Sequence, residues 1–276
     1  MNEQNLFSGR TLVVAFEGWN DAGESASNAA RFLIEAVQGI EISGVDSQNY
    51  YDFQFARPQV ALDENGKRVF RWPNAALYRP AMPELFDLRV LLGVEPSRNW
   101  IDFATEIADS VEGEEIDSVV FLGAMLADAP HTRPIQITAT STNDEVCESV
   151  PAEKSLYEGP VGILSVLSAE FENRGIPTMS FWAAVPHYVH NGPVPKSTLA
   201  LVNSVQELLG LQFAQGDLPD EAFKWERAVD ELAEADEDLA EYVSSLEKTR
   251  DEIDGATGET IAAEVEQFLR DADEER

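Results

Sequence analysis

Side chains capable of chemistry gather in the stretch VVFLGAMLADAPHTRP at residues 119–134. We expect an apolar strand that ends at Gly123, followed by a polar loop that carries Asp128, His131 and Arg133 and is stiffened by Pro130 and Pro134. In alternating α/β folds, sites are built in the loops at the carboxyl ends of strands. Such a loop could bind a polar ligand, with His131 as the proton carrier because its ordinary pKa lies near neutrality. Alternatively, Arg133 pairs with Asp128 and the loop makes a subunit contact.

A second polar loop, with Glu17, Trp19 and Asp21, lies between a predicted strand at 11–16 and a predicted helix at 22–37. Its acidic side chains would repel an anion at the start of that helix. We expect Asp21 to cap the helix instead. Trp19 either packs under a neighbouring loop or lines a pocket.

Other reactive side chains give weak signals. His187 follows a proline and precedes His190 by three residues, a pattern that favours a structural or interface role over a metal site. No serine has the GxSxG surroundings of a hydrolase nucleophile. The single cysteine, Cys147, has acidic neighbours that disfavour its thiolate. We therefore expect no catalytic residue, no metal and no cofactor.

The charge of the chain constrains its partners. The 276 residues include 51 acidic and 19 basic side chains, a net charge of -32. Such a surface repels nucleic acids and anionic membranes, so a protein partner is the better prediction. The apolar run at 119–127 is also far shorter than the ~20 residues that cross a bilayer. The start of the sequence has no signal-peptide pattern, so we expect a cytoplasmic protein.

Hydrophobic patterns alternate between strand and helix along residues 1–216. This alternation predicts an α/β core domain, with a mostly parallel sheet flanked by helices. The predicted helices cover residues 22–37, 100–111, 162–173 and 197–209, and the predicted strands cover 11–16, 74–79, 86–94, 116–122, 135–140 and 178–183. Residues 41–53 are expected to form one or two further strands, and 58–73 a hairpin that turns at Glu64, Asn65 and Gly66.

Residues 217–276 form a compositional unit with 22 acidic and 6 basic side chains, half of the net charge of the chain. Apolar residues recur in it every seven positions, which predicts one narrow stripe along a long acidic helix. The stripe runs through Trp225, Leu232, Leu239, Leu246 and Ile253, with Asp236 and Arg250 at companion positions. We expect this C-terminal extension to pack on the body or on a second copy, and to break at Gly255 and Gly258.

Three motifs together resemble the bacterial (actinobacterial) branch of the proteasome assembly chaperone 2 family. They are FEGWNDAG at 16–23, GAMLADAPHTRP at 123–134 and GIPTMSFWAAVPHYV at 175–189, with PVPKSTLALV at 193–202 as a weaker fourth. The resemblance implies a self-associating fold similar to nucleoside phosphorylases, and a non-enzymatic role as an assembly factor for proteasome subunits. Relatives that dock on the proteasome commonly end in a hydrophobic residue, a tyrosine and one last residue. This sequence ends in DEER, so we expect docking through the folded surface or the acidic helix.

Two hypotheses follow. In the first, the protein is a homo-oligomeric assembly factor, with a trimer favoured by resemblance and by the prevalence of closed symmetric assemblies. In the second, it is a small-molecule-binding protein or an enzyme of the nucleoside phosphorylase or hydrolase type. Its cleft would then lie between the loop at 17–21 and the loop at 128–133, with His187 nearby and with Asp21 or His131 transferring protons.

Overall fold

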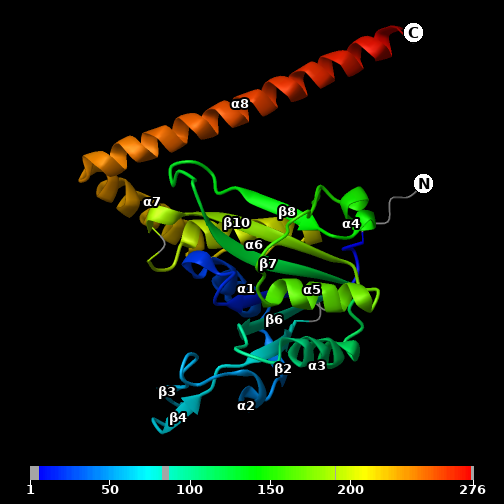
Figure 1. The fold of residues 1–276 in the computed structure, drawn as a ribbon, viewed down its shortest axis with the longest axis vertical. Helices are drawn as coiled ribbons and strands as arrows, with labels where there is room; N and C mark the ends of the chain where they lie inside the picture. Colours follow the sequence, from blue (N-terminus) through cyan, green and yellow to red (C-terminus); the bar gives the residue numbers. More distant parts are fainter. Residues whose placement is uncertain (1–5, 83–86, 190, 275–276) are drawn as a thin grey trace.

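The computed structural model describes residues 6–82, 87–189 and 191–274, with side chains described as far as residue 255. Its main sheet consists of β1 Thr11–Glu17, β2 Ile40–Gly44, β5 Ala75–Arg79, β6 Leu88–Val94, β7 Ser118–Ala127, β8 Ile137–Ser141, β9 Glu153–Lys154 and β10 Thr178–Pro186. These strands lie in the order β2-β5-β6-β1-β7-β10-β8-β9 (Figure 1). The central strands β6, β1, β7 and β10 are parallel, whereas β2 and β5, β5 and β6, and β10 and β8 pair antiparallel. The short strand β9 pairs parallel with β8. The predicted α/β class with a mostly parallel sheet is confirmed.

Four helices cover the two faces of this sheet: α1 Ser25–Ala36, α3 Trp100–Glu112, α5 Ile163–Asn173 and α6 Pro195–Leu209. Alternate residues of β1 point to opposite faces, so Val13 packs in the core beside α1 and α6, and Val14 in the core beside α3 and α5. Both faces of β1 are therefore buried. This explains the uninterrupted apolar run in its sequence, which is typical of an inner parallel strand.

Shorter elements complete the chain: the helices α2 Ser47–Tyr50 and α4 Asp144–Ser149, the 3-10 turns η1 Ala22–Glu24 and η3 His187–Val189, and the hairpin strands β3 Gln59–Leu62 and β4 Arg68–Arg71. The hairpin prediction is confirmed. The prediction of strands throughout 41–53 is wrong beyond Gly44, because the Asp46 side chain accepts a hydrogen bond from the Gln48 amide and starts α2.

The expected end of the central strand at Gly123 is also wrong. β7 continues to Ala127 and pairs along its added length with β10, which itself extends to Pro186. Gly123 lies opposite Trp182 in this register, and a Cβ atom built at Gly123 would stand 2.4 Å from the Trp182 ring. The glycine therefore makes room for an indole inside a continuing strand.

The C-terminal extension forms two helices, α7 Leu218–Glu234 and α8 Glu237–Glu274 (Figure 1). The break falls at Asp236, whose side chain accepts hydrogen bonds from the amides of Asp238 and Leu239. The breaks expected at Gly255 and Gly258 are absent from the described backbone, in which α8 is continuous. α7 packs against α6, and its Trp225 contacts the core beside α1 and α6.

The seven-residue stripe is only partly buried. Leu246 is buried, whereas Leu232 and Ile253 are 59% and 54% exposed. The kink at Asp236 turns α8 away from the direction of α7, so one straight stripe cannot face the body along its whole length. The buried side of the extension is instead built from Ala222, Val229, Ala233, Val243 and Leu246.

Candidate functional site

His131, the predicted proton carrier, is enclosed by the protein and is 1% exposed. The Tyr188 hydroxyl accepts a hydrogen bond from the His131 backbone amide at 2.9 Å and lies 2.8 Å from Nδ1 of its ring. Nε2 lies 3.2 Å from Oδ1 of Asp230 on α7. Because a carboxylate can only accept, Nε2–H of a neutral imidazole donates to Asp230, and Nδ1 then accepts the hydrogen bond from the Tyr188 hydroxyl.

The enclosure of His131 disfavours the charged form of its imidazole. Burial lowers the pKa of the imidazole, and the opposing effect of Asp230 offsets that shift only in part. Lys196, at the start of α6, donates a hydrogen bond to the His131 carbonyl oxygen at 2.5 Å and pairs with Glu226 of α7 at 2.9 Å. The loop backbone is thus fixed by α6 and α7 together, and its imidazole is shielded from a solvent ligand.

Arg133 faces α8. Its Nε and Nη2 atoms each lie 2.8 Å from a different carboxylate oxygen of Asp251, and Nη1 lies 3.1 Å from Oε1 of Glu247. Hydrogen bonds from Arg133 lower the pKa of Asp251. The expected pair between Arg133 and Asp128 is therefore wrong. The guanidinium makes a bidentate contact with the extension instead, a geometry that lysine cannot reproduce.

Asp128 belongs to an aromatic cluster that His187 also joins. Its Oδ1 atom accepts a hydrogen bond from the Tyr242 hydroxyl of α8 at 3.1 Å and lies 3.3 Å from Nδ1 of His187. The His187 ring lies edge-on to Tyr188 and Tyr242, with centroid distances of 5.7 and 5.6 Å. Within the described residues, no group of three histidine, cysteine, aspartate or glutamate side chains could hold a metal ion.

The loop after β1 has a structural role in helix α1. The Asp21 carboxylate accepts hydrogen bonds from the amides of Ala26 and Ser27 at 2.8 and 3.0 Å, so the expected capping of the helix is confirmed. Burial raises the pKa of Asp21, and these hydrogen bonds oppose the rise. Glu17 forms an ion pair with Arg31 of α1.

Trp19 matches neither of its expected roles, because its side chain is 72% exposed. It therefore neither packs under a loop nor lines an enclosed pocket. The loop after β1 contacts β7: the Ala124 amide of β7 donates a hydrogen bond to the Asn20 carbonyl oxygen at 2.8 Å. β7 then runs on to Ala127 before the second loop begins.

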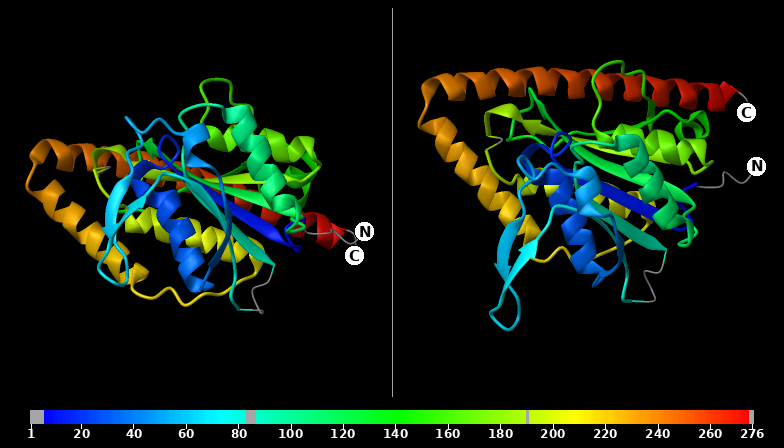
Figure 2. Two further views of the ribbon diagram at one scale, coloured as in Figure 1. Left: turned by 90° about the horizontal axis from the view of Figure 1, so that it is seen from below. Right: turned by 60° about the horizontal axis from the view of Figure 1, so that its bottom comes forward.

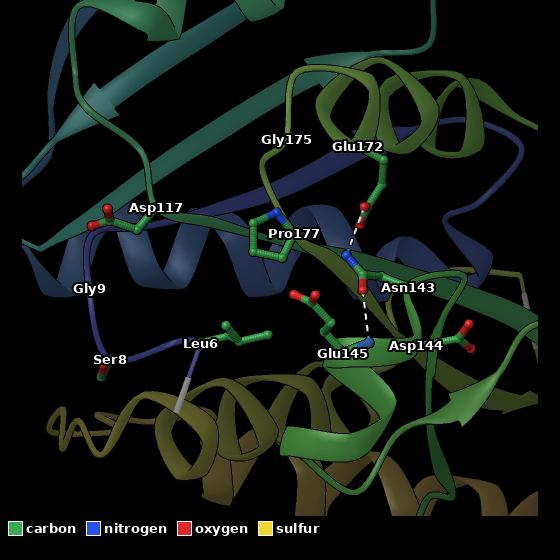
Figure 3. Close-up of a pocket in the computed structure, with 10 residues that line it drawn as sticks. All are labelled: Leu6, Ser8, Gly9, Asp117, Asn143, Asp144, Glu145, Glu172, Gly175 and Pro177. Atoms are coloured by element: carbon green, nitrogen blue, oxygen red, sulfur yellow. Dashed lines mark hydrogen bonds between the residues drawn. The ribbon is translucent and has the colours of Figure 1, made fainter. Parts of the chain in front are cut away.

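A surface hollow of about 790 Å³ lies at the opposite end of the strands from the two candidate loops, near the amino ends of β1, β7 and β10 (Figure 3). None of the sequence-predicted site residues lines it. Two of its carboxylates are engaged with the protein: Glu172 accepts from Asn143 and from the Thr178 amide, and Asp117 accepts from the Arg10 amide. Its lining residues are Leu6, Ser8, Gly9, Asp117, Asn143, Asp144, Glu145, Glu172, Gly175 and Pro177.

The predicted loop thus binds the protein's own C-terminal extension. We call its residues Asp128, His131 and Arg133, together with their partners in the extension, the clasp. Sequence reasoning found the body residues of this clasp but missed Tyr188 and the carboxylates of the extension. A usable signal was present, since Glu247 and Asp251 lie four residues apart on one side of a helix and could face a single arginine.

A comparison with protein families matches the PAC2 family over residues 15–233. The chain belongs to the PAC2 family. A PAC2 family protein from Streptomyces avermitilis is similar in structure, with 39% identity, a TM-score of 0.77, and coverage of 84% of this chain and 99% of that one. A proteasome-assembly chaperone homologue from Mycobacterium tuberculosis gives 38% identity, a TM-score of 0.75, and coverage of 84% and 99%.

The fold of this PAC2 protein also extends to archaea. An archaeal proteasome activator from Pyrococcus furiosus has a TM-score of 0.63 at 17% identity, covering 81% of this chain and 93% of that one. A comparison with curated proteins found no significant match. Within the described part of the chain, every helix falls short of the length or the apolar character that crossing a bilayer requires.

Proposed function

We propose that this PAC2 protein is a non-enzymatic assembly factor in the cytoplasm, a homotrimer whose protein partners are proteasome subunits. The observation that carries the proposal is the enclosure of His131 and the bidentate pairing of Arg133 with Asp251. The chemically capable residues at the strand ends are engaged by the protein's own extension. The names of the Mycobacterium and Pyrococcus proteins support proteasome subunits as the first partners to test.

The solvent-facing side of α8 is the contact surface that we favour for a partner. Glu247 and Asp251 tie one side of the helix to Arg133, whereas Glu252 is exposed on another side. The excess of acid in the extension predicts a basic surface on the partner. The alternative of a phosphorylase-type enzyme loses support, because its proposed acid and base, Asp21 and His131, are both buried in structural hydrogen bonds.

The test uses purified proteasome α and β subunits of the source organism. The full-length protein should bind immobilised subunits and accelerate the appearance of assembled particles on native gels. Binding should weaken as salt rises, because exposed charges are screened over about 10 Å at 0.1 M ionic strength. Glu252→Lys should weaken binding several-fold more than Glu158→Lys, a matched reversal at an exposed position of the body.

Absence of binding to either subunit, together with unchanged assembly kinetics, would refute the proteasome role. Capture from an extract of the source organism would then show whether another complex takes the place of the proteasome. Equal effects of the two glutamate reversals would place the partner contact away from α8.

A further inference from the structure

The β3–β4 hairpin projects from the body as a ribbon (Figure 1), and one of its two faces is apolar and largely exposed. Its register pairs Val60 with Phe70, and alternation places Leu62 and Trp72 on the same side of the ribbon. These four side chains are between 47% and 64% exposed. An isolated two-stranded hairpin is marginally stable in water. A neighbour that covers this face would therefore stabilise it.

The ribbon is also locally basic within a strongly acidic chain. Residues 57–72 carry the bases Arg57, Lys67, Arg68 and Arg71 against the acids Asp63 and Glu64, whereas the whole chain has a net charge of -32. Arg68 and Arg71 are both exposed on β4. Arg68 lies opposite Leu62 on the apolar side of the ribbon, and Arg71 lies opposite Gln59 on the other side. An occupant of this surface should accordingly be acidic and should offer an apolar side chain.

The chain itself contains a segment with these properties at the kink between α7 and α8. This elbow, residues 231–241, contains six acids and no base: Glu231, Glu234, Asp236, Glu237, Asp238 and Glu241. It also carries Leu232, which is 59% exposed. The elbow is a projecting corner of the molecule, so its carboxylates and its leucine are accessible to a second molecule (Figure 1).

The ribbon and the elbow of one molecule lie apart in all the views of the fold (Figures 1 and 2). We propose that the basic ribbon of one copy binds the acidic elbow of the next copy, with Leu232 packing on the apolar face beside Trp72. Different surfaces then meet at each contact, and such a head-to-tail interface propagates until the ring closes. The inference extends the proposed homotrimer by naming its two complementary surfaces.

The test reverses charges on each surface and measures molar mass by light scattering and sedimentation. The wild-type protein should form an oligomer of its 30.5 kDa chain. Arg68→Glu with Arg71→Glu should give monomers, and so should Glu231→Lys with Glu234→Lys. The latter pair lies in the last turn of α7, where positive charge favours the helix, so folding should be preserved. Arg79→Glu with Lys248→Glu changes the net charge as much as the ribbon pair does and should leave the oligomer intact.

Combining both sets of substitutions in one chain is the decisive step. A chain that carries all four substitutions should recover the wild-type mass, because the introduced lysines of one copy then face the introduced glutamates of the next copy at every contact of the ring. If the ribbon packed on another ribbon, this combination would not restore assembly.

Three results would overturn the inference: a monomeric wild-type protein at every concentration, an unchanged mass after ribbon reversal, or a monomeric chain with all four substitutions. These measurements contain no proteasome subunit. Their failure would therefore leave the proposed assembly role standing, and failure of subunit binding would leave the ring contact standing.

Discussion

Replacing Leu246 by alanine tests whether α8 is docked on the body in solution. Leu246 is 9% exposed, although it lies on a helix that is otherwise highly charged. Leucine-to-alanine changes at buried sites cost about 2–5 kcal/mol, the larger values arising where a cavity persists. A surface helix can settle into the gap, so we expect the lower end, about 2 kcal/mol. Alanine is the better helix former, so the loss should come from docking and not from the helix itself.

A cost of about 2 kcal/mol corresponds to roughly a 30-fold shift in the docking equilibrium. Hydrogen exchange measured by mass spectrometry should show this shift as faster exchange in α8 and in the loop between β7 and β8, with β1 unchanged. Ile253→Ala is the matched control, because Ile253 lies seven residues further along the same stripe and is 54% exposed. Its effect should stay within about 0.5 kcal/mol.

Equal exchange in the two variants would refute this reasoning. It would mean that Leu246 is no better covered than Ile253 in solution, and that α8 is not docked on the loop through Asp128 and Arg133.

Three further changes probe the clasp and the strand that leads to it. Arg133→Lys keeps the charge but loses the bidentate contact with Asp251, so exchange in residues 128–136 should accelerate, and unchanged protection would show that the contact contributes nothing. Burial lowers the pKa of His131 below 6.5, so the unfolded chain binds the proton at a higher pH than the folded chain does. Protonation then favours the unfolded state, and His131→Gln should flatten the fall in Tm between about pH 7.5 and about pH 5.5. A parallel fall in Tm in both proteins would contradict this assignment. Gly123→Ala places a methyl group against the Trp182 ring and should lower the free energy of unfolding in urea by about 1–3 kcal/mol, whereas no change would mean that the indole swings aside.

The local elements were predictable because each follows from a pattern within a few residues. The β-branched run of β1, the helical spacing in α1 and α3, and the turn residues of the β3–β4 hairpin each predict the element that the structure contains. Where such a pattern gives a wrong prediction, a contact with a distant segment of the chain determines the local structure. Gly123 resembles a strand end in sequence, yet the chain there stays extended because it pairs with β10. The glycine is needed because the ring of Trp182, 59 positions away, occupies the space where a Cβ atom would lie.

The sequence by itself determined which side chains of the clasp loop are capable of chemistry, and it determined that the C-terminal extension is acidic and helical. Only the tertiary structure decided what those side chains do. The partners of His131 and Arg133 are Asp230, Glu247 and Asp251, each about a hundred residues further along the chain. Local propensity cannot specify pairing over such separations, because it depends on how α7 packs on α6 and on where Asp236 turns the helix. Packing thus converts an apparent catalytic loop into the docking point of the extension.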